Sequence, residues 1–422
     1  MLNTYFKRFV MASGLTNFAD GVATVAWAWL ASLLTRDPVL IAAVPIALRL
    51  PWFLFAIPAG IITDRTDRRR LILTMDVLRA AAFLLAGFAV WQALPLDPAP
   101  QAGVSDTVLF AILVGSALAV GVAEVFRDNA AQTILPSIVP HQALEKANGR
   151  LWSIELIGNG LLGPALGAFL IAYALQAPLL VNAAAYILAV ILMISVVGDF
   201  RPVSTGSRNW RRELKEGLQF LRQHRLLRSL AWITGFWNLL FNMVFIALVL
   251  HVQENLDAGP RTYGLILASG AVGGVAGGWL GDRIVAWLGP CRTAQTMLLA
   301  SVPAFFAMAY APNALALCII FAVFEFTGIV WNTVSVSYRQ RLIPDALLGR
   351  VNSVYRLMAW GMMPIGLALS GALVRMTDGW LDRSTALISP FLAATLGAML
   401  LGWLGWIALA RGFADTPSSP DP

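Results

Sequence analysis

The sequence contains little of what a soluble enzyme needs. Charged residues make up only 13% of its 422 residues, and there are 3 histidines and 2 cysteines, Cys291 and Cys318. So few thiols exclude a disulfide framework, and the cysteines and histidines match no metal-ligand or redox spacing. The apolar segments contain no His-rich group and no nucleophile beside a base, which argues against a membrane enzyme. We therefore expect no cofactor, no metal site and no catalytic residue.

The chain is unusually rich in hydrophobic residues. Hydrophobic residues make up 58% of the sequence, and the mean hydropathy is +0.72. A bilayer is the natural solvent for so much apolar surface. The net charge of +7 does not indicate nucleic acid, because the cations gather in polar loops that a membrane topology explains. We predict an all-α membrane protein. We expect it to contact membrane lipid and not to bind nucleic acid.

Twelve apolar segments can be drawn, each near the ~20 residues that span a hydrocarbon core. They are predicted at 8–34, 38–63, 71–95, 106–132, 149–174, 177–198, 229–252, 262–286, 292–311, 313–338, 350–376 and 386–410. The first segment is too long for a signal peptide and has no small-residue cleavage site, so we expect an uncleaved helix. If Lys7 and Arg8 lie in the cytoplasm, alternation of the segments places both termini on the cytoplasmic side. The same alternation places there the loops near 64–70, 133–148, 199–228, 287–291 and 339–349. These cytoplasmic regions hold most of the Lys and Arg, as expected for a membrane protein.

Two internal repeats predict a duplicated chain. A charged Gly-x-x-x-Asp-Arg motif, here called the charged step, occurs twice, and we interpret each copy as a hairpin between apolar runs. The first copy contains Gly60, Asp64, Arg65 and Arg68. The second copy, 218 positions later, contains Gly278, Asp282 and Arg283. A second repeat aligns 138–148 with 342–352. We therefore predict bundles at 1–198 and 229–411, with a substrate site at their interface. The linker 199–228 has the spacing of an amphipathic helix on the inner leaflet, and the tail 412–422 is predicted to be disordered.

Ionisable side chains deep in a membrane are costly and indicate function. Asp20 lies about twelve residues, or ~18 Å, into the first segment, which is near the midplane. Asn17, Thr24 and Trp27 share its helix face, so we expect this stripe to line a water-filled substrate cavity. Arg49 lies at similar depth in the second segment and is the expected partner of Asp20. The pair is either a static link or a proton-coupling site in which protonation of Asp20 releases Arg49.

Other polar residues divide into three sets. Glu325 lies near the midplane of the tenth segment with no cation within a turn, and either binds a proton or cationic substrate or is a neutral core residue. Two helical pairs, Asp76 with Arg79 and Glu124 with Arg127, are interpreted as local ion pairs of an inner gate. Asn238 and Asn242 share a face beside an aromatic stripe, and either line a pocket for an amphiphilic molecule or pack.

These residues resemble one family. The two charged steps resemble the signature loops of the major facilitator superfamily, although Asp67 stands where that family has glycine. The segments around Asp20, Arg49, Asp76–Arg79 and Glu124–Arg127 resemble the bacterial branch that contains the enterobactin exporter and macrolide efflux proteins. Gly163-Pro164-Ala165-Leu166-Gly167-Ala168 resembles that superfamily's exporter-associated motif.

The resemblance implies a fold and a function. The fold would be twelve transmembrane helices in two pseudo-symmetric six-helix bundles, with Asp64 latching the cytoplasmic side. The function would be a secondary active transporter of a bacterial cytoplasmic membrane, acting as a monomeric, proton-coupled exporter (antiporter) of small amphiphilic molecules such as drugs or siderophores by alternating access. A lysophospholipid facilitator and a transporter-like receptor that moves nothing are the alternatives.

Overall fold

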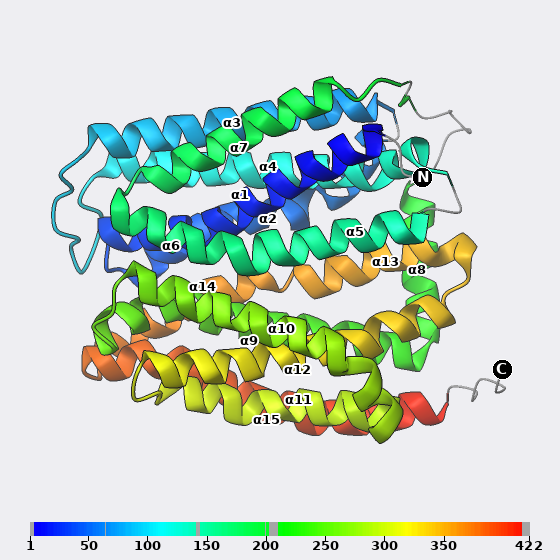
Figure 1. The fold of residues 1–422 in the computed structure, drawn as a ribbon. Helices are drawn as coiled ribbons and strands as arrows, with labels where there is room; N and C mark the ends of the chain where they lie inside the picture. The colour runs from blue at the N-terminus through cyan, green and yellow to red at the C-terminus, as the bar shows by residue number, and fades with distance from the viewer. Residues whose placement is uncertain (1–3, 64, 141–143, 199, 202–209, 416–422) are drawn as a thin grey trace. The chain divides into compact units, whose positions relative to one another are not determined.

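The computed structural model describes the chain except for residues 1–3, 64, 141–143, 199, 202–209 and 416–422. Throughout the described ranges the regular structure is helical, with no strand. In each half of the chain, long helices lie side by side along their lengths (Figure 1). This all-α architecture is the one predicted from the apolar segments.

In the part of the chain that the structure describes, twelve long helical spans match the twelve predicted segments. They are α1 Thr4–Leu34, α2 Pro38–Thr63, α3 Arg68–Gln92, α4 Thr107–Ile138, α5 Leu144–Glu155 with α6 Gly163–Tyr173, α7 Ala177–Ile194, α9 Arg225–Leu250, α10 Pro260–Leu288, α11 Pro290–Ala309, α12 Ala314–Leu342, α13 Asp345–Trp360 with α14 Met363–Asp378, and α15 Arg383–Ala414. Ten spans among the described residues are long and apolar enough to cross a membrane. The other two spans, α1 and α11, are not among these ten.

The helices form two compact units. Unit 1 is Met1–Gly206 with Val249–Ala271, and unit 2 is Ser207–Leu248 with Val272–Pro422. In this division 249–271 groups with the N-terminal helices, and the predicted bundle bounds at 198 and 229 remain a prediction. In unit 1, α1 packs against α6 and α7, and α3 packs against α4 and α7. In unit 2, α11 packs against α12 and α15, and α14 against α15.

Arginines hold one end of unit 1 together. Arg8 Nη1 donates to the carbonyl oxygen of Ser195 (2.8 Å), and Arg69 Nε donates to that of Met193 (3.1 Å), both at the end of α7. Arg68 Nη1 donates to the carbonyl oxygen of Thr133 near the end of α4 (3.0 Å). The last carbonyls of a helix have no partner within the helix and carry its negative dipole end, so these cations stabilise the helix ends.

The two charged steps differ in structure. The first step turns between α2 and α3, where the Asp67 carboxylate caps α3 by accepting from Arg70 N at 3.0 Å. The second step is not a hairpin, and that interpretation was wrong: 278–283 lie inside α10, which continues to Leu288. The chain turns at Gly289, whose φ of +79° favours glycine, and proline follows at the first position of α11.

Small residues bring helices into close contact in unit 2, where the helix α10 is rich in glycine. Gly273, Gly277 and Gly281 lie at successive turns, and a methyl group on any of them would collide with α12. The added carbon at Gly277 would lie 2.7 Å from the carbonyl oxygen of Phe326. Backbone contact of this kind replaces the hydrophobic driving force that is missing between helices in lipid.

A helix, α8 Trp210–Gln223, lies in the predicted linker and packs against α13. Leu221 is buried, and a methyl group on Gly217 would lie 2.7 Å from the carbonyl oxygen of Arg350. Glu216 accepts from Arg350 Nη1 at 2.5 Å and from Arg212 Nε at 2.9 Å. The small and apolar side of this helix is therefore bound to protein, and its contact with the inner leaflet remains a prediction.

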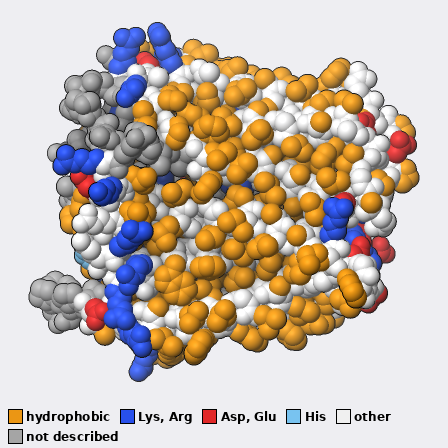
Figure 2. Space-filling view, turned by 180° about the vertical axis from the view of Figure 1, so that it is seen from behind, with side chains coloured by type: hydrophobic (Ala, Val, Ile, Leu, Met, Phe, Trp, Pro, Cys, Tyr) orange, Lys and Arg blue, Asp and Glu red, His pale blue; other side chains and the backbone are white. Residues whose placement is uncertain are grey.

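The surface of both units suits a bilayer. Figure 2 shows hydrophobic side chains over most of the face in view, with Lys and Arg mostly towards its margins. Large exposed side chains include Phe88 and Trp91 in unit 1 and Trp403 and Trp406 in unit 2. Exposed apolar surface of this extent is stable in contact with lipid, and in water it would drive aggregation.

Candidate functional site

Asp20 lies at the centre of a buried charge cluster in unit 1. Its Oδ1 accepts from Arg79 Nη2 of α3 and, at 2.6 Å, from the Tyr186 hydroxyl of α7. The Asp20 side chain is 23% exposed, whereas the Arg79 side chain is 1% exposed. The predicted Asp20–Arg49 ion pair is therefore wrong: α3 and α7, which pack against each other, supply both partners of this carboxylate.

Aromatic rings fix the position of Arg79. Its guanidinium carbon lies 4.3 Å from the centroid of the Tyr186 ring. Tyr186 stacks on Phe83 (5.6 Å between centroids), and Phe83 stacks on Trp27 (5.4 Å). A guanidinium over an aromatic face is stabilised by the ring quadrupole, and more so away from water. The stack therefore helps to stabilise a cation inside a membrane-spanning bundle.

A second layer of charges lies beside the first. Asp76 is fully buried, and its Oδ1 is 3.6 Å from Arg127 Nε of α4. Neither Asp76 oxygen has a hydrogen-bond partner among the residues that the structure describes. Arg127 also lies 3.6 Å from Asp128 Oδ1 and donates weakly to the Ser13 hydroxyl of α1 at 3.5 Å. Asp76 is thus a buried carboxylate with an ion-pair partner but incomplete hydrogen bonding, a costly arrangement.

Arg49 pairs with Glu124 of α4, at 3.9 Å between Nη1 and Oε1. The predicted local pairs, Asp76 with Arg79 and Glu124 with Arg127, are therefore wrong. Charged residues three apart on one helix share a face, but here each acid lies nearer to an arginine of another helix. Packing between helices, which spacing along one helix does not reveal, decides the partners.

The cluster contains more acids than bases. Ion pairs connect four carboxylates with three guanidinium groups: Asp20, Asp76, Glu124 and Asp128, with Arg49, Arg79 and Arg127. With every group ionised the cluster carries one net negative charge. One bound proton would neutralise it, which is the chemistry that a proton-coupled site requires.

Glycines form a close helix crossing directly beside Asp20. A methyl group on Gly21 would lie 2.6 Å from the carbonyl oxygen of Asn159, and one on Gly163 would lie 2.6 Å from the Cα of Gly21. A methyl group on Gly167 would lie 2.7 Å from the carbonyl oxygen of Val22. The backbones of α1 and of the α5–α6 span therefore touch, at a π-helical stretch over Leu156–Leu162 that separates α5 from α6. Stretches of this kind are frequent at functional sites.

The other candidates on α1 make local contacts. Asn17 Nδ2 donates to the carbonyl oxygen of Ser13 (2.9 Å), and the Thr24 hydroxyl to that of Asp20 (3.0 Å). Trp27 is 2% exposed and lies in the packed interior of unit 1. In this structure Trp27 is a packing residue, while a substrate role for Asn17 and Thr24 remains a prediction.

In unit 2, Glu325 adjoins an aromatic cluster. Phe324 stacks on Trp237 (5.3 Å) and on Phe241 (5.8 Å). Gly328 lies on the same face of α12 as Glu325. It packs beside the Trp237 ring, because a methyl group added to Gly328 would lie 3.4 Å from that ring. Glu325 is half-buried and has no charged partner among the described residues.

Asn238 and Asn242 are buried in unit 2. Asn238 Nδ2 donates to the carbonyl oxygen of Ala359 in α13 at 3.0 Å, and Asn242 Nδ2 to that of Asn238 at 2.8 Å. Asn238 therefore links α9 to α13. Their predicted role as pocket residues remains a prediction.

The gate residues of the two charged steps are only partly described. Asp64, the predicted latch, lies outside the described residues. Arg65 is exposed, and no atom would contact a methyl group on Gly60 within 4 Å. Asp282 and Arg283 are exposed on α10, one turn beyond Gly278. A gate role for this set remains a prediction.

Sequence reasoning missed two members of the cluster. Tyr186 was hidden in an otherwise apolar segment, where a single hydroxyl was the only signal. Asp128 directly follows Arg127, and a residue next to a predicted pair carried no separate signal. Both complete the cluster from positions that no spacing rule connects to Asp20.

The geometry is that of a membrane transporter with charges buried inside a helical bundle. Residues 1–401 match the family described as transmembrane secretion effector, and the chain belongs to this family of the major facilitator superfamily. Macrolide efflux protein A of Streptococcus pyogenes is 25% identical over 336 residues, covering 76% of this chain and 77% of that protein.

Two solved structures share the fold. A bacterial homologue of the iron transporter ferroportin has a TM-score of 0.72 at 16% identity, with 98% of this chain and 99% of that chain covered. A bacterial homologue of the human lysosomal transporter Spinster has a TM-score of 0.73 at 14% identity, with 99% and 98% covered. At these identities the likeness is one of fold alone. The chain is thus a multi-pass membrane transporter of the major facilitator fold.

Proposed function

We propose that this chain is a proton-coupled exporter that moves small amphiphilic organic molecules out of a bacterial cell by alternating access. The observation that carries the proposed coupling is the charge count of the cluster, four carboxylates to three guanidinium groups. The direction of transport and the class of cargo are supported by the similarity to macrolide efflux protein A.

Proton uptake would act first on the bond between Asp20 and Arg79. An excess carboxylate in a low-dielectric interior is costly, and a bound proton removes that cost. Asp20 is the proposed entry point, because it is partly exposed and its carboxylate connects α1 with both α3 and α7, whereas Asp76 is fully buried. A neutral carboxyl attracts a guanidinium much less than a carboxylate does, so protonation would loosen α1 from α3.

Loosening α1 supplies the conformational step. The glycine crossing leaves no side chains interlocked between α1 and α6 at Gly21 and Gly167, so the two helices can shift against each other. A proton or a substrate moves the equilibrium between states only if it binds them with different affinity. We propose that substrate and proton favour opposite charge states of the cluster, which makes their transport an exchange.

The aromatic cluster of unit 2 is the proposed contact for cargo. The partly exposed rings of Trp237 and Phe241, which stack on the buried Phe324, suit an apolar ring system, and Glu325 nearby suits a cationic amine. The proposed orientation places the arginine-rich end of unit 1 and both termini in the cytoplasm. There Asp64 would form the predicted latch.

The test is efflux of a radiolabelled macrolide into inverted membrane vesicles with an imposed pH gradient. We expect accumulation that follows the gradient and collapses when an ionophore dissipates it. Accumulation that ignores the gradient would refute proton coupling. Transport of labelled lysophospholipid but no macrolide would support the lipid facilitator, and no transport of any probe by folded protein would support the receptor.

A further inference from the structure

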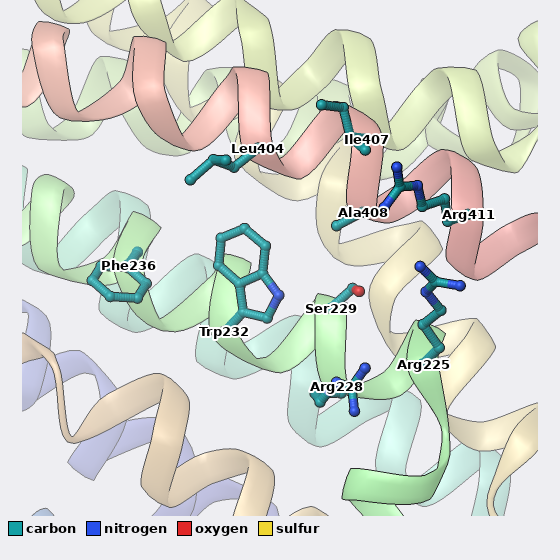
Figure 3. A pocket seen from close by; sticks show the side chains of 9 residues that line it. All are labelled: Arg225, Arg228, Ser229, Trp232, Phe236, Leu404, Ile407, Ala408 and Arg411. Atoms are coloured by element: carbon teal, nitrogen blue, oxygen red, sulfur yellow. The ribbon is translucent and has the colours of Figure 1, made fainter.

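A groove of about 650 Å³ lies on the surface of unit 2 between α9 and α15. Its two ends differ in chemistry, as Figure 3 shows. Arg225 and Arg228 from the first turn of α9 and Arg411 from the last turn of α15 gather at one end. Trp232 and Phe236 line the other end, with Leu404 opposite (Figure 3). A ligand with a negatively charged group at one end and an apolar chain at the other would match these two ends of the groove.

The described residues only partly balance the charges at the polar end. Arg225 Nη1 pairs with Asp415 Oδ2 at 3.1 Å, and Arg228 Nη1 donates to the carbonyl oxygen of Arg222 at 2.9 Å. In the described part of the chain, Asp415 is the only carboxylate paired with any of the three guanidinium groups. Arg225 and Arg228 also stand at the positive end of the α9 dipole, where cations are unfavourable unless an anion is present.

The apolar end suits an acyl chain. Phe236 is 46% exposed, and Ile407 is 36% exposed, on helices that span the membrane. Trp232 meets Phe236 edge to face, with centroids 6.3 Å apart. From Arg228 to Phe236 the groove follows α9 for eight residues, or ~12 Å at the helical rise. A phosphate at the arginines would therefore have ~12 Å of apolar wall for its acyl chain.

We propose that this groove binds an anionic glycerophospholipid, with its phosphate against the three arginines and an acyl chain along Trp232 and Phe236. Basic pockets between transmembrane helices hold anionic headgroups in this way. A soluble phosphate would leave the aromatic wall without a partner, and a zwitterionic lipid would leave the excess arginine charge uncompensated. The bound lipid bridges the first and last membrane spans of unit 2, and so clamps that bundle independently of its cargo.

The experiment is native mass spectrometry of the purified full chain in detergent, titrated with phosphatidylglycerol or phosphatidylcholine. We expect one tightly held phosphatidylglycerol, and a 20- to 30-fold loss of its affinity in R228Q/R411Q, which corresponds to about 1 kcal/mol per arginine. The matched control is R292Q/R341Q, which removes two cations of unit 2 that do not line the groove. It should keep the lipid.

A second variant separates lipid from free phosphate. Ala408 lines the groove beside the arginines, and Ala408→Leu fills it while all three cations remain. We expect this variant to lose phosphatidylglycerol, and we expect inorganic phosphate at the same concentration not to displace the lipid from the native chain. Equal retention of phosphatidylcholine, displacement by phosphate, or lipid retention in R228Q/R411Q would each overturn the proposal. If that double variant does not fold, Ala408→Leu still decides.

Discussion

The close crossing of α1 and the α5–α6 span makes a stability prediction that contrasts two glycines. In Gly21→Ala the new methyl group would lie 2.6 Å from a backbone oxygen, where 3.4 Å is ordinary contact, so the helices must separate by about 0.8 Å. Overpacking of this kind costs about 1–3 kcal/mol. Alanine in place of glycine inside a helix regains about 1 kcal/mol at most. We expect a net loss of up to about 2 kcal/mol.

Gly115 is the matched control, because it lies inside α4 with no atom within 4 Å of an added methyl group. Gly115→Ala should therefore stabilise the protein by about 0.5–1 kcal/mol. Thermal unfolding of both purified variants in one detergent measures the difference. A Gly21→Ala variant as stable as Gly115→Ala would refute the backbone contact beside Asp20. Slower efflux by folded Gly21→Ala, with Gly115→Ala unchanged, would tie that contact to transport.

Three further predictions concern other parts of the chain. Glu216→Gln should weaken the attachment of α8 by less than about 1 kcal/mol, since exposed ion pairs are weak, and hydrogen exchange in α8 should rise; unchanged exchange would contradict this. Glu325→Gln should slow transport of cationic amphiphiles more than that of neutral ones in competition assays, and an equal loss would remove its proposed role. Hydrogen bonds from Ser384 and Thr385 lower the pKa of Asp382, the cap of α15, to about 2. The stabilisation is therefore present above about pH 4 and lost as the pH falls through about 2. Asp382→Ala should lower the Tm at pH 7 but not in strong acid, and a constant difference would refute this.

The fold could be predicted because the bilayer constrains it strongly. Each span needs about twenty apolar residues, so hydropathy alone placed α2 at its observed bounds, Pro38–Thr63. The ends were harder, because capping depends on single side chains. Asp67 looked like a departure from a family loop but caps α3, which begins at Arg68, three residues before the predicted start. The step at Gly278 looked like a turn, yet nothing there breaks a helix until Gly289.

The site was harder to predict because its partners come from different helices. Depth in the membrane correctly singled out Asp20 as a polar residue inside the bundle. Depth does not say which helices are neighbours, so Arg49 was chosen where packing supplies Arg79 and Tyr186. The order of helices around a bundle is a tertiary property, and periodicity along one helix carries no information about it.

The central claim is that the charge cluster exchanges a proton for cargo. The most direct measurement is the proton release that accompanies macrolide binding to the purified chain, followed with a pH indicator in weakly buffered detergent. We predict release by the native chain and by Asp378→Asn, which alters an exposed Asp–Arg pair at 3.0 Å, and none by Asp20→Asn. Binding without proton release in the native chain, or undiminished release in Asp20→Asn, would contradict the account.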